Sequence, residues 1–92
     1  MSAFIIVDLT PLDTEKLAQY SAAAAATIAQ YNGEFIAKAP IEALNGGEHR
    51  KVKVVIQFPD RDAAAGWYQS DDYQALIPLR DQAMDAVFHL VG

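Results

Sequence analysis

The chain has 92 residues, about half of them hydrophobic, and a formal net charge of −5. This length suits a single domain, which we expect to span residues 1–92. The acidic balance and the scattered basic residues argue against nucleic acid and anionic membranes as partners. The sequence has no cysteine, which excludes disulfides, thiol nucleophiles and thiolate metal sites. The N-terminal apolar run is too short for a signal peptide or a membrane span, so we expect a soluble, cytoplasmic protein.

The first strand and the first helix follow from apolar spacing. Residues 3–9 predict a strand, which Pro11 is expected to end. Asp13, or the threonine after it, caps a predicted helix that runs to about residue 31. The alanine run at 22–26 favours this helix and lets it lie close to whatever it covers.

Turn residues divide the middle of the chain. An Asn-Gly pair is expected to end the first helix, and we predict that Gly33 takes the left-handed backbone conformation there. Residues 34–39 predict the second strand, which Pro40 interrupts. Asn-Gly-Gly at 45–47 is a turn signal that leads back into a third strand over 51–58.

The third strand and the helix after it form the most informative stretch of the sequence. One face of this strand is fully apolar and should meet the core; it consists of Val52, Val54, Ile56 and Phe58. Pro59 stops the strand, and Asp60 can cap a helix that carries Trp67 and Tyr68 toward the sheet. Ser-Asp-Asp at 70–72 predicts a break and a new cap.

The last part of the chain predicts further helix and a final strand. Apolar residues at helical spacing continue from Tyr73 to Met84. Pro78 falls inside this stripe, so we expect a kink or a restart there. Residues 86–91 predict the last strand.

The element order is strand, helix, strand, strand, helix, strand. This order predicts an α+β fold, the ferredoxin-like βαββαβ sandwich, with helices on one face of a four-stranded antiparallel sheet. The first and third strands should form its central pair. The opposite sheet face would carry Ile6, Asp8, Ile36, Lys38, Lys53, Val55 and Gln57. Because so apolar a face is unfavourable in water, we expect a homodimer that covers it with a second copy.

The sequence resembles the domain-of-unknown-function 1330 family, small bacterial proteins within the dimeric α/β-barrel superfamily. The matching positions are Tyr20, Gly33, Phe58, Pro59, Ala64, Trp67, Tyr68, Ser70, Tyr73 and Arg80. The most specific of these form a Trp-Tyr-x-Ser-x-x-Tyr pattern with a downstream arginine. The resemblance implies a ferredoxin-like protomer and a homodimer whose sheets form a barrel, but no established reaction. Superfamily relatives include cofactor-free monooxygenases, haem-degrading enzymes, muconolactone isomerase-like proteins and ligand-binding domains.

Aromatic side chains could form a pocket between helices and sheet for a planar ligand, or could simply be core. The candidate ligand-binding residues are Tyr20, Trp67, Tyr68, Tyr73, Arg80 and His89. Arg80 could clamp a carboxylate, or it could pair with a nearby aspartate (Asp60, Asp71 or Asp72) or pack its stem on Trp67 or Tyr73.

The two histidines offer little chemistry. His89 could act as a base, but its place in the last strand favours a partly buried structural side chain. His49 lies near the predicted turn, and this position favours a solvated loop side chain. The sequence shows no third side chain that would join the two histidines as a metal ligand, so we predict neither a metal nor a cofactor. Asp8 and Lys53 could form a site pair, or a structural ion pair between adjacent strands.

Two functions remain open from the sequence. The first is a small cofactor-free enzyme, monooxygenase- or isomerase-like, that acts on a small hydrophobic or aromatic molecule. The second is a non-catalytic dimer that binds a small molecule or serves as a structural module. An ionisable group beside an empty apolar volume would favour the enzyme, and a filled interior with every polar group paired would favour the module.

Overall fold

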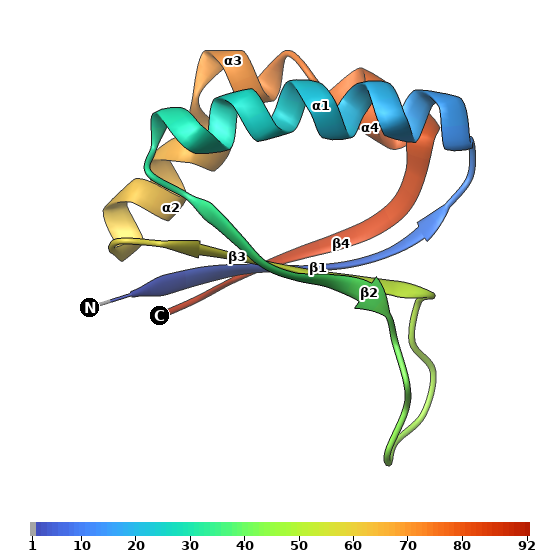
Figure 1. Ribbon diagram of the computed structural model, residues 1–92. Helices are drawn as coiled ribbons and strands as arrows, with labels where there is room; N and C mark the ends of the chain where they lie inside the picture. The colour runs from blue at the N-terminus through green and yellow to red at the C-terminus, as the bar shows by residue number, and fades with distance from the viewer. Residues whose placement is uncertain (1) are drawn as a thin grey trace.

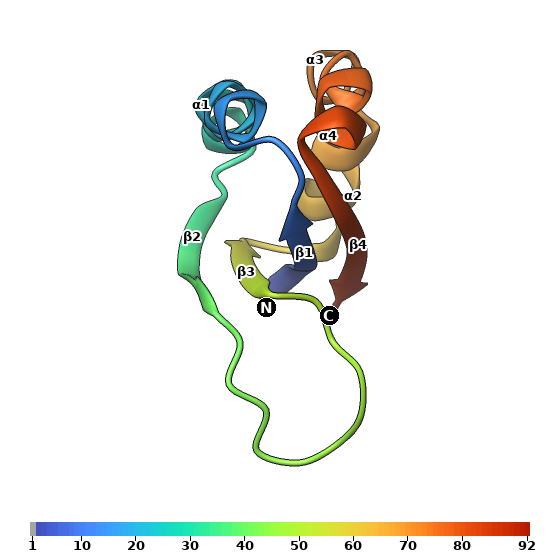
Figure 2. The ribbon, with the colours of Figure 1, turned by 90° about the vertical axis from the view of Figure 1, so that its right-hand side faces the viewer.

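A computed structural model describes residues 2–92 of the protein (Figure 1). Its elements are β1 (Ala3–Pro11), α1 (Thr14–Gln30), β2 (Glu34–Pro40), β3 (Val52–Phe58), α2 (Arg61–Gln69), α3 (Asp71–Gln74), α4 (Ile77–Ala83) and β4 (Met84–Val91). The strands form one antiparallel sheet in the order β2-β3-β1-β4. All helices lie on one side of this sheet (Figure 2). The predicted α+β ferredoxin-like fold is confirmed, and β1 and β3 are its central pair.

The core lies between the sheet and the helices. Alternate β1 residues from Ala3 to Leu9 are buried, and they pair in register with the buried residues Val54, Ile56 and Phe58 and the partly buried Val52 of β3. The three largest fully buried side chains are Phe58, Trp67 and Tyr73. Their rings touch, with centroid distances of 5.6 Å for Phe58–Trp67 and 4.3 Å for Trp67–Tyr73. The Trp67 helix therefore meets the sheet as its apolar spacing predicted.

Side-chain caps fix where the helices begin. Asp13 accepts a hydrogen bond from the Lys16 backbone amide at 3.0 Å and so caps α1. Asp60 caps α2 in the same way, through the amide of Ala63 at 2.8 Å. Both predicted caps are confirmed. Pro78 lies in the first turn of α4, where its missing N–H is harmless, so the chain restarts its helix there.

The end of α1 differs from the prediction. Asn32, not Gly33, takes the left-handed conformation, with φ of 60°. The Asn32 and Gly33 amides donate to the carbonyls of Ala29 and Ile28, which closes a Schellman motif. Gly33 is required for another reason: a Cβ atom there would lie 2.6 Å from Ile28 and 2.7 Å from Phe58. Close packing, and not backbone conformation, selects this glycine.

Three strands are longer than the sequence suggested. β2 includes Pro40, which was expected to interrupt it but pairs with Val52 and is tolerated because β2 is an edge strand. β1 continues through Pro11, which pairs with Met84. Beyond Leu9 only β4 pairs with β1, and this strand end tolerates a proline. Met84 accordingly begins β4, whereas its spacing had placed it on the preceding helix.

The edge strand β2 contains a β-bulge that the sequence did not reveal. Phe35 pairs with Ile56 and Lys38 pairs with Val54, with a register shift between Phe35 and Ala37. The extra residue turns Lys38 to the helix side of the sheet, so its predicted place on the opposite face is wrong. Asp8 and Lys53 do lie on that opposite face, as predicted, with Asp8 Oδ1 3.3 Å from Lys53 Nζ.

Residues 41–51 connect β2 to β3 as a long loop, which extends away from the helices (Figures 1 and 2). Within residues 2–92, no helix is long and apolar enough to cross a membrane.

We expect Trp67→Ala to lower the free energy of unfolding by about 3–5 kcal/mol, because it removes a fully buried indole. Denaturant unfolding measures this change. Leu12→Ala is the matched control, since Leu12 is 62% exposed and lies outside the core, and it should cost far less than Trp67→Ala. A small effect of Trp67→Ala would mean that the indole ring is not packed in the core.

Candidate functional site

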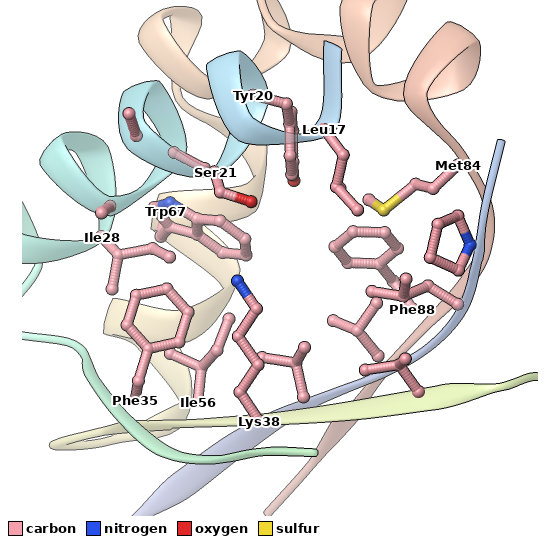
Figure 3. A pocket seen from close by; sticks show the side chains of 18 residues that line it. Leu17, Tyr20, Ser21, Ile28, Phe35, Lys38, Ile56, Trp67, Met84 and Phe88 are labelled. Atoms are coloured by element: carbon pink, nitrogen blue, oxygen red, sulfur yellow. The ribbon is translucent and has the colours of Figure 1, made fainter. Parts of the chain in front are cut away.

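A cavity of about 440 Å³ lies between α1 and the sheet (Figure 3). Its lining consists of Val7, Leu9, Pro11, Leu17, Tyr20, Ser21, Ala22, Ala24, Ala25, Ile28, Phe35, Lys38, Val52, Val54, Ile56, Trp67, Met84 and Phe88. The walls are almost entirely apolar. The volume falls within the range of small-molecule sites.

The cavity exists because α1 stands away from the sheet. This helix packs mainly against α4 and α3, and Figure 2 shows it beside α4. The residues that α1 turns to the strands beneath it include Ala24 and Ala25. Their methyl groups are too short to reach across to Val54 and Ile56. The alanine run was expected to let the helix lie close to whatever it covers; on the side toward the sheet, its small side chains border the cavity instead.

Two polar groups of the lining are already hydrogen-bonded within the protein. The Tyr20 hydroxyl lies 2.8 Å from the hydroxyl of Tyr73. The Trp67 indole N–H donates to Thr27 Oγ1 at 2.9 Å, and Thr27 in turn donates to the carbonyl of Ala24. These bonds satisfy buried donors and hold the aromatic wall rigid.

The other polar side chains of the lining are Ser21 and Lys38. Figure 3 shows the Lys38 amine reaching into the cavity from β2 and the Ser21 hydroxyl pointing in from α1. Lys38 is the only charged residue among those that line the cavity. It lies beside Phe35, which is 44% exposed, at the β2 edge.

Behind the cavity, Arg80 joins a cluster of tyrosines. Its Nη1 donates to the hydroxyls of Tyr68 at 3.0 Å and Tyr73 at 3.3 Å. The guanidinium also lies 5.0 Å from the centre of the Phe88 ring, a cation–π distance. Burial lowers the pKa of Arg80, but its hydrogen bonds to Tyr73 and Tyr68 raise it overall above the usual value. Arg80 is therefore a permanent cation.

Burial raises the pKa of Tyr20, and the neighbouring Tyr73 raises it further. Burial also raises the pKa of Tyr73, against the opposing effect of its hydrogen bonds with Tyr20 and Arg80. Both phenols are consequently neutral at physiological pH. They act as hydrogen-bonding groups and not as bases.

Arg80 does not pair with Asp60, Asp71 or Asp72, which were its predicted aspartate partners. Its carboxylate contact is Asp81, at 3.1 Å from Nε. Asp60 is instead occupied as the cap of α2. Packing of its stem on Trp67 or Tyr73 stays a prediction; the contacts of Arg80 with aromatic residues are the hydrogen bond to the Tyr73 hydroxyl and the cation–π contact with Phe88.

The six predicted ligand-binding residues fall into three places. Tyr20 and Trp67 line the main cavity. Tyr68 and His89 line a second, smaller hollow of about 260 Å³ between α2 and β4. Tyr73 and Arg80 connect the two regions and line neither. Ligand binding by these six residues stays a prediction.

The histidines do not approach a metal site. His89 is exposed on the single chain, and not partly buried as its strand position suggested. The ring of His49 contacts the backbone carbonyl of Arg50 in the loop. Within the described part of the chain, no three His, Asp or Glu side chains come together as candidate metal ligands.

Sequence reasoning missed the residues that give the cavity its shape and charge. Ala24, Ala25 and Ser21 had a usable signal, since they extend a run of small residues along the inner side of a helix. Lys38 had none, because its orientation depends on a bulge that strand alternation does not reveal.

Comparison with known proteins identifies the family. The sequence profile of DUF1330, a domain of unknown function, matches residues 2–92. The chain belongs to the DUF1330 family. No curated protein matches the sequence.

Solved structures share the fold at low identity. A protein of unknown function from Rhodopseudomonas palustris is 14% identical with a TM-score of 0.77, covering 98% of this chain and 80% of that one. A dimeric ferredoxin-like protein of unknown function from Jannaschia sp. is 13% identical with a TM-score of 0.75, covering 100% and 99%. SnoaB, a cofactor-independent oxygenase from Streptomyces nogalater, is 12% identical with a TM-score of 0.72, covering 99% and 91%. At such identities this DUF1330 protein shares with them a fold, and no activity follows.

We expect Arg80→Lys to destabilise the ligand-free protein by about 1–2 kcal/mol, because an ammonium cannot bridge both phenols from one planar group. Thermal and denaturant unfolding measure the loss. Arg61→Lys is the control, since Arg61 makes one exposed hydrogen bond, to the carbonyl of Gly92. Equal stability of wild type and Arg80→Lys would contradict a structural role.

Proposed function

We propose that this DUF1330 protein binds a small, largely apolar molecule in the cavity beneath α1. The observation that carries the proposal is an apolar volume of about 440 Å³ that the protein's own side chains leave unfilled. Burial of apolar ligand surface there would release about 25 cal/mol per Å². Unfilled volume in a domain of this size is unfavourable unless something occupies it.

The walls of the cavity suit a binding site because they are fixed before a ligand arrives. Trp67 is fully buried, and its indole N–H is held by Thr27. Tyr20 is held by Tyr73. A pre-organised aromatic wall loses little entropy on binding, and flat rings favour a planar or extended partner.

A second candidate is a cofactor-free enzyme at the same site. Lys38 supports it, since an ionisable group adjoins an apolar volume, and so does the likeness to SnoaB, a cofactor-independent oxygenase. Without a cofactor, the substrate itself must carry the negative charge that develops during reaction. The Lys38 ammonium is the one charged group of the lining that could stabilise it. Turnover of a bound molecule, lost in Lys38→Met, would separate this function from binding alone.

We also propose that the functional form is a homodimer joined through the sheet face opposite the helices. Residues of this face include Phe4, Ile6, Val55, Val87 and His89. Asp8 Oδ1 is buried there, and its 3.3 Å contact with Lys53 lacks hydrogen-bond geometry, so the atom lacks a donor within residues 2–92. A second copy could supply one. The proteins from Jannaschia sp. and Bacteroides fragilis with this fold are described as dimeric.

The loop 41–51 supports the same arrangement. It extends from the sheet on the side away from the helices, where the second copy would lie (Figures 1 and 2). Leu44, near its tip, is 91% exposed on the single chain. A partner surface would remove this side chain from water.

We expect Ala24→Leu to abolish ligand binding, because the larger side chain fills the cavity from α1. A neutral fluorescent dye, N-phenyl-naphthylamine, reports binding by its enhanced emission in apolar surroundings. Ala26→Leu is the matched control: it makes the same change on the same helix at an exposed position outside the lining. Loss of dye binding in both variants, or in neither, would contradict the proposed site.

We expect the wild type to be a dimer at micromolar concentration and Val55→Asp to be a monomer. The change places an uncompensated charge opposite Ile6 on the apolar sheet face. Light scattering coupled to size exclusion gives the mass. Ala18→Asp, on the exposed side of α1, should remain dimeric. A monomeric wild type would refute the interface.

A further inference from the structure

We propose that the cavity selects an amphiphile with a single acidic group, a monocarboxylate. Its charged end lies against Lys38, and its apolar body extends toward Trp67. The inference rests on the proposed binding beneath α1 and adds the chemical class of the ligand.

The β-bulge in β2 places Lys38 at this site. In a regular strand Phe35 and Lys38 would point to opposite faces, because their spacing is odd. The register shift sets Phe35 opposite Ile56 and Lys38 opposite Val54, so both face the helices. A bulge disrupts the ladder locally, and bulges recur where a side chain is redirected toward a functional site.

Lys38 has no carboxylate partner among the residues that the structure describes. The ion pairs within residues 2–92 join Arg50 to Asp85, Lys53 to Asp8 and Arg80 to Asp81. No acidic residue lines the cavity. In a chain with a net charge of −5, an ammonium that faces an apolar cavity without an acidic neighbour leaves a positive site for an anion.

Ser21 supplies the second donor. Figure 3 shows its hydroxyl pointing into the cavity from the wall opposite Lys38. One ammonium and one hydroxyl match the two oxygens of a carboxylate. The Trp67 donor is occupied by Thr27, and the Tyr20 hydroxyl is paired with that of Tyr73. A phosphate, with more charge and more acceptors, would lack partners here.

The position of Lys38 also sets the orientation of the ligand. Lys38 is exposed, and its neighbour Phe35 is partly exposed, so this side of the cavity meets water. A carboxylate beside Lys38 keeps part of its hydration and avoids the penalty of a deeply buried charge. The rings of Trp67 and Phe88, which lie to either side of the Lys38 amine in Figure 3, then receive the apolar body.

The test is competition with bound N-phenyl-naphthylamine by octanoate and by octanol at neutral pH. The two competitors have the same chain and differ in charge. In the wild type we expect octanoate to displace the dye at about a tenfold lower concentration, equivalent to about 1.4 kcal/mol. Added salt should reduce this preference, because Lys38 is exposed.

Four variants make the result specific. Lys38→Met should abolish the preference for octanoate while the dye still binds, and Lys38→Arg should retain it. Ser21→Ala should reduce it in part. Lys16→Met should leave it unchanged, because the Lys16 amine donates to Gln82 at the surface and does not line the cavity.

The outcomes separate the two proposals. If the dye does not bind, or if Ala24→Leu does not block it, the proposed function fails. If the dye binds at the cavity but octanoate and octanol compete equally in the wild type, the monocarboxylate inference alone is overturned. Persistence of the preference in folded Lys38→Met would overturn it as well.

Discussion

The indole of Trp67 sets the spacing on which the rest of the molecule depends. Its ring packs on Phe58 of β3, and its N–H donates to Thr27 of α1. One side chain thus spans the distance from sheet to first helix. Because an indole is large, α1 is held away from the strands, and the alanines beside Thr27 cannot fill the gap. The cavity is a direct consequence of a large residue beside a run of small ones.

A second constraint ties the three C-terminal helices to the first one. The Arg80 guanidinium of α4 bonds to Tyr68 of α2 and Tyr73 of α3, and Tyr73 reaches Tyr20 of α1. The permanent cation and the neutral phenols suit each other, because a phenol oxygen can accept from Arg80 and still share its proton. This network occupies the one cation that the sequence offered as a ligand clamp. The charge available to the cavity comes instead from Lys38, at the edge strand.

The elements and their order could be predicted because they depend on local signals. Asp13 and Asp60 cap helices wherever an exposed first turn follows them, and alternating apolar residues specify the core face of β1 and β3. The site could be predicted only in part. Tyr20 and Trp67 line the cavity because large aromatic residues on inner helix faces must reach the interior. Whether these rings fill the interior or border a cavity depends on the residues that face them from other elements. The spacing of the aromatic residues along their own helices does not reveal those partners.

The sequence by itself determined the fold class, the strand order implied by that class, the helix starts and the absence of thiol chemistry. Each depends on residues near one another in the chain or on composition alone. Only the tertiary structure decided that α1 stands off the sheet, that Gly33 is required by Ile28 and Phe58, and that Lys38 faces the cavity. These features arise where segments distant in sequence meet. A register shift or a void is a property of two surfaces together, and neither surface encodes it alone.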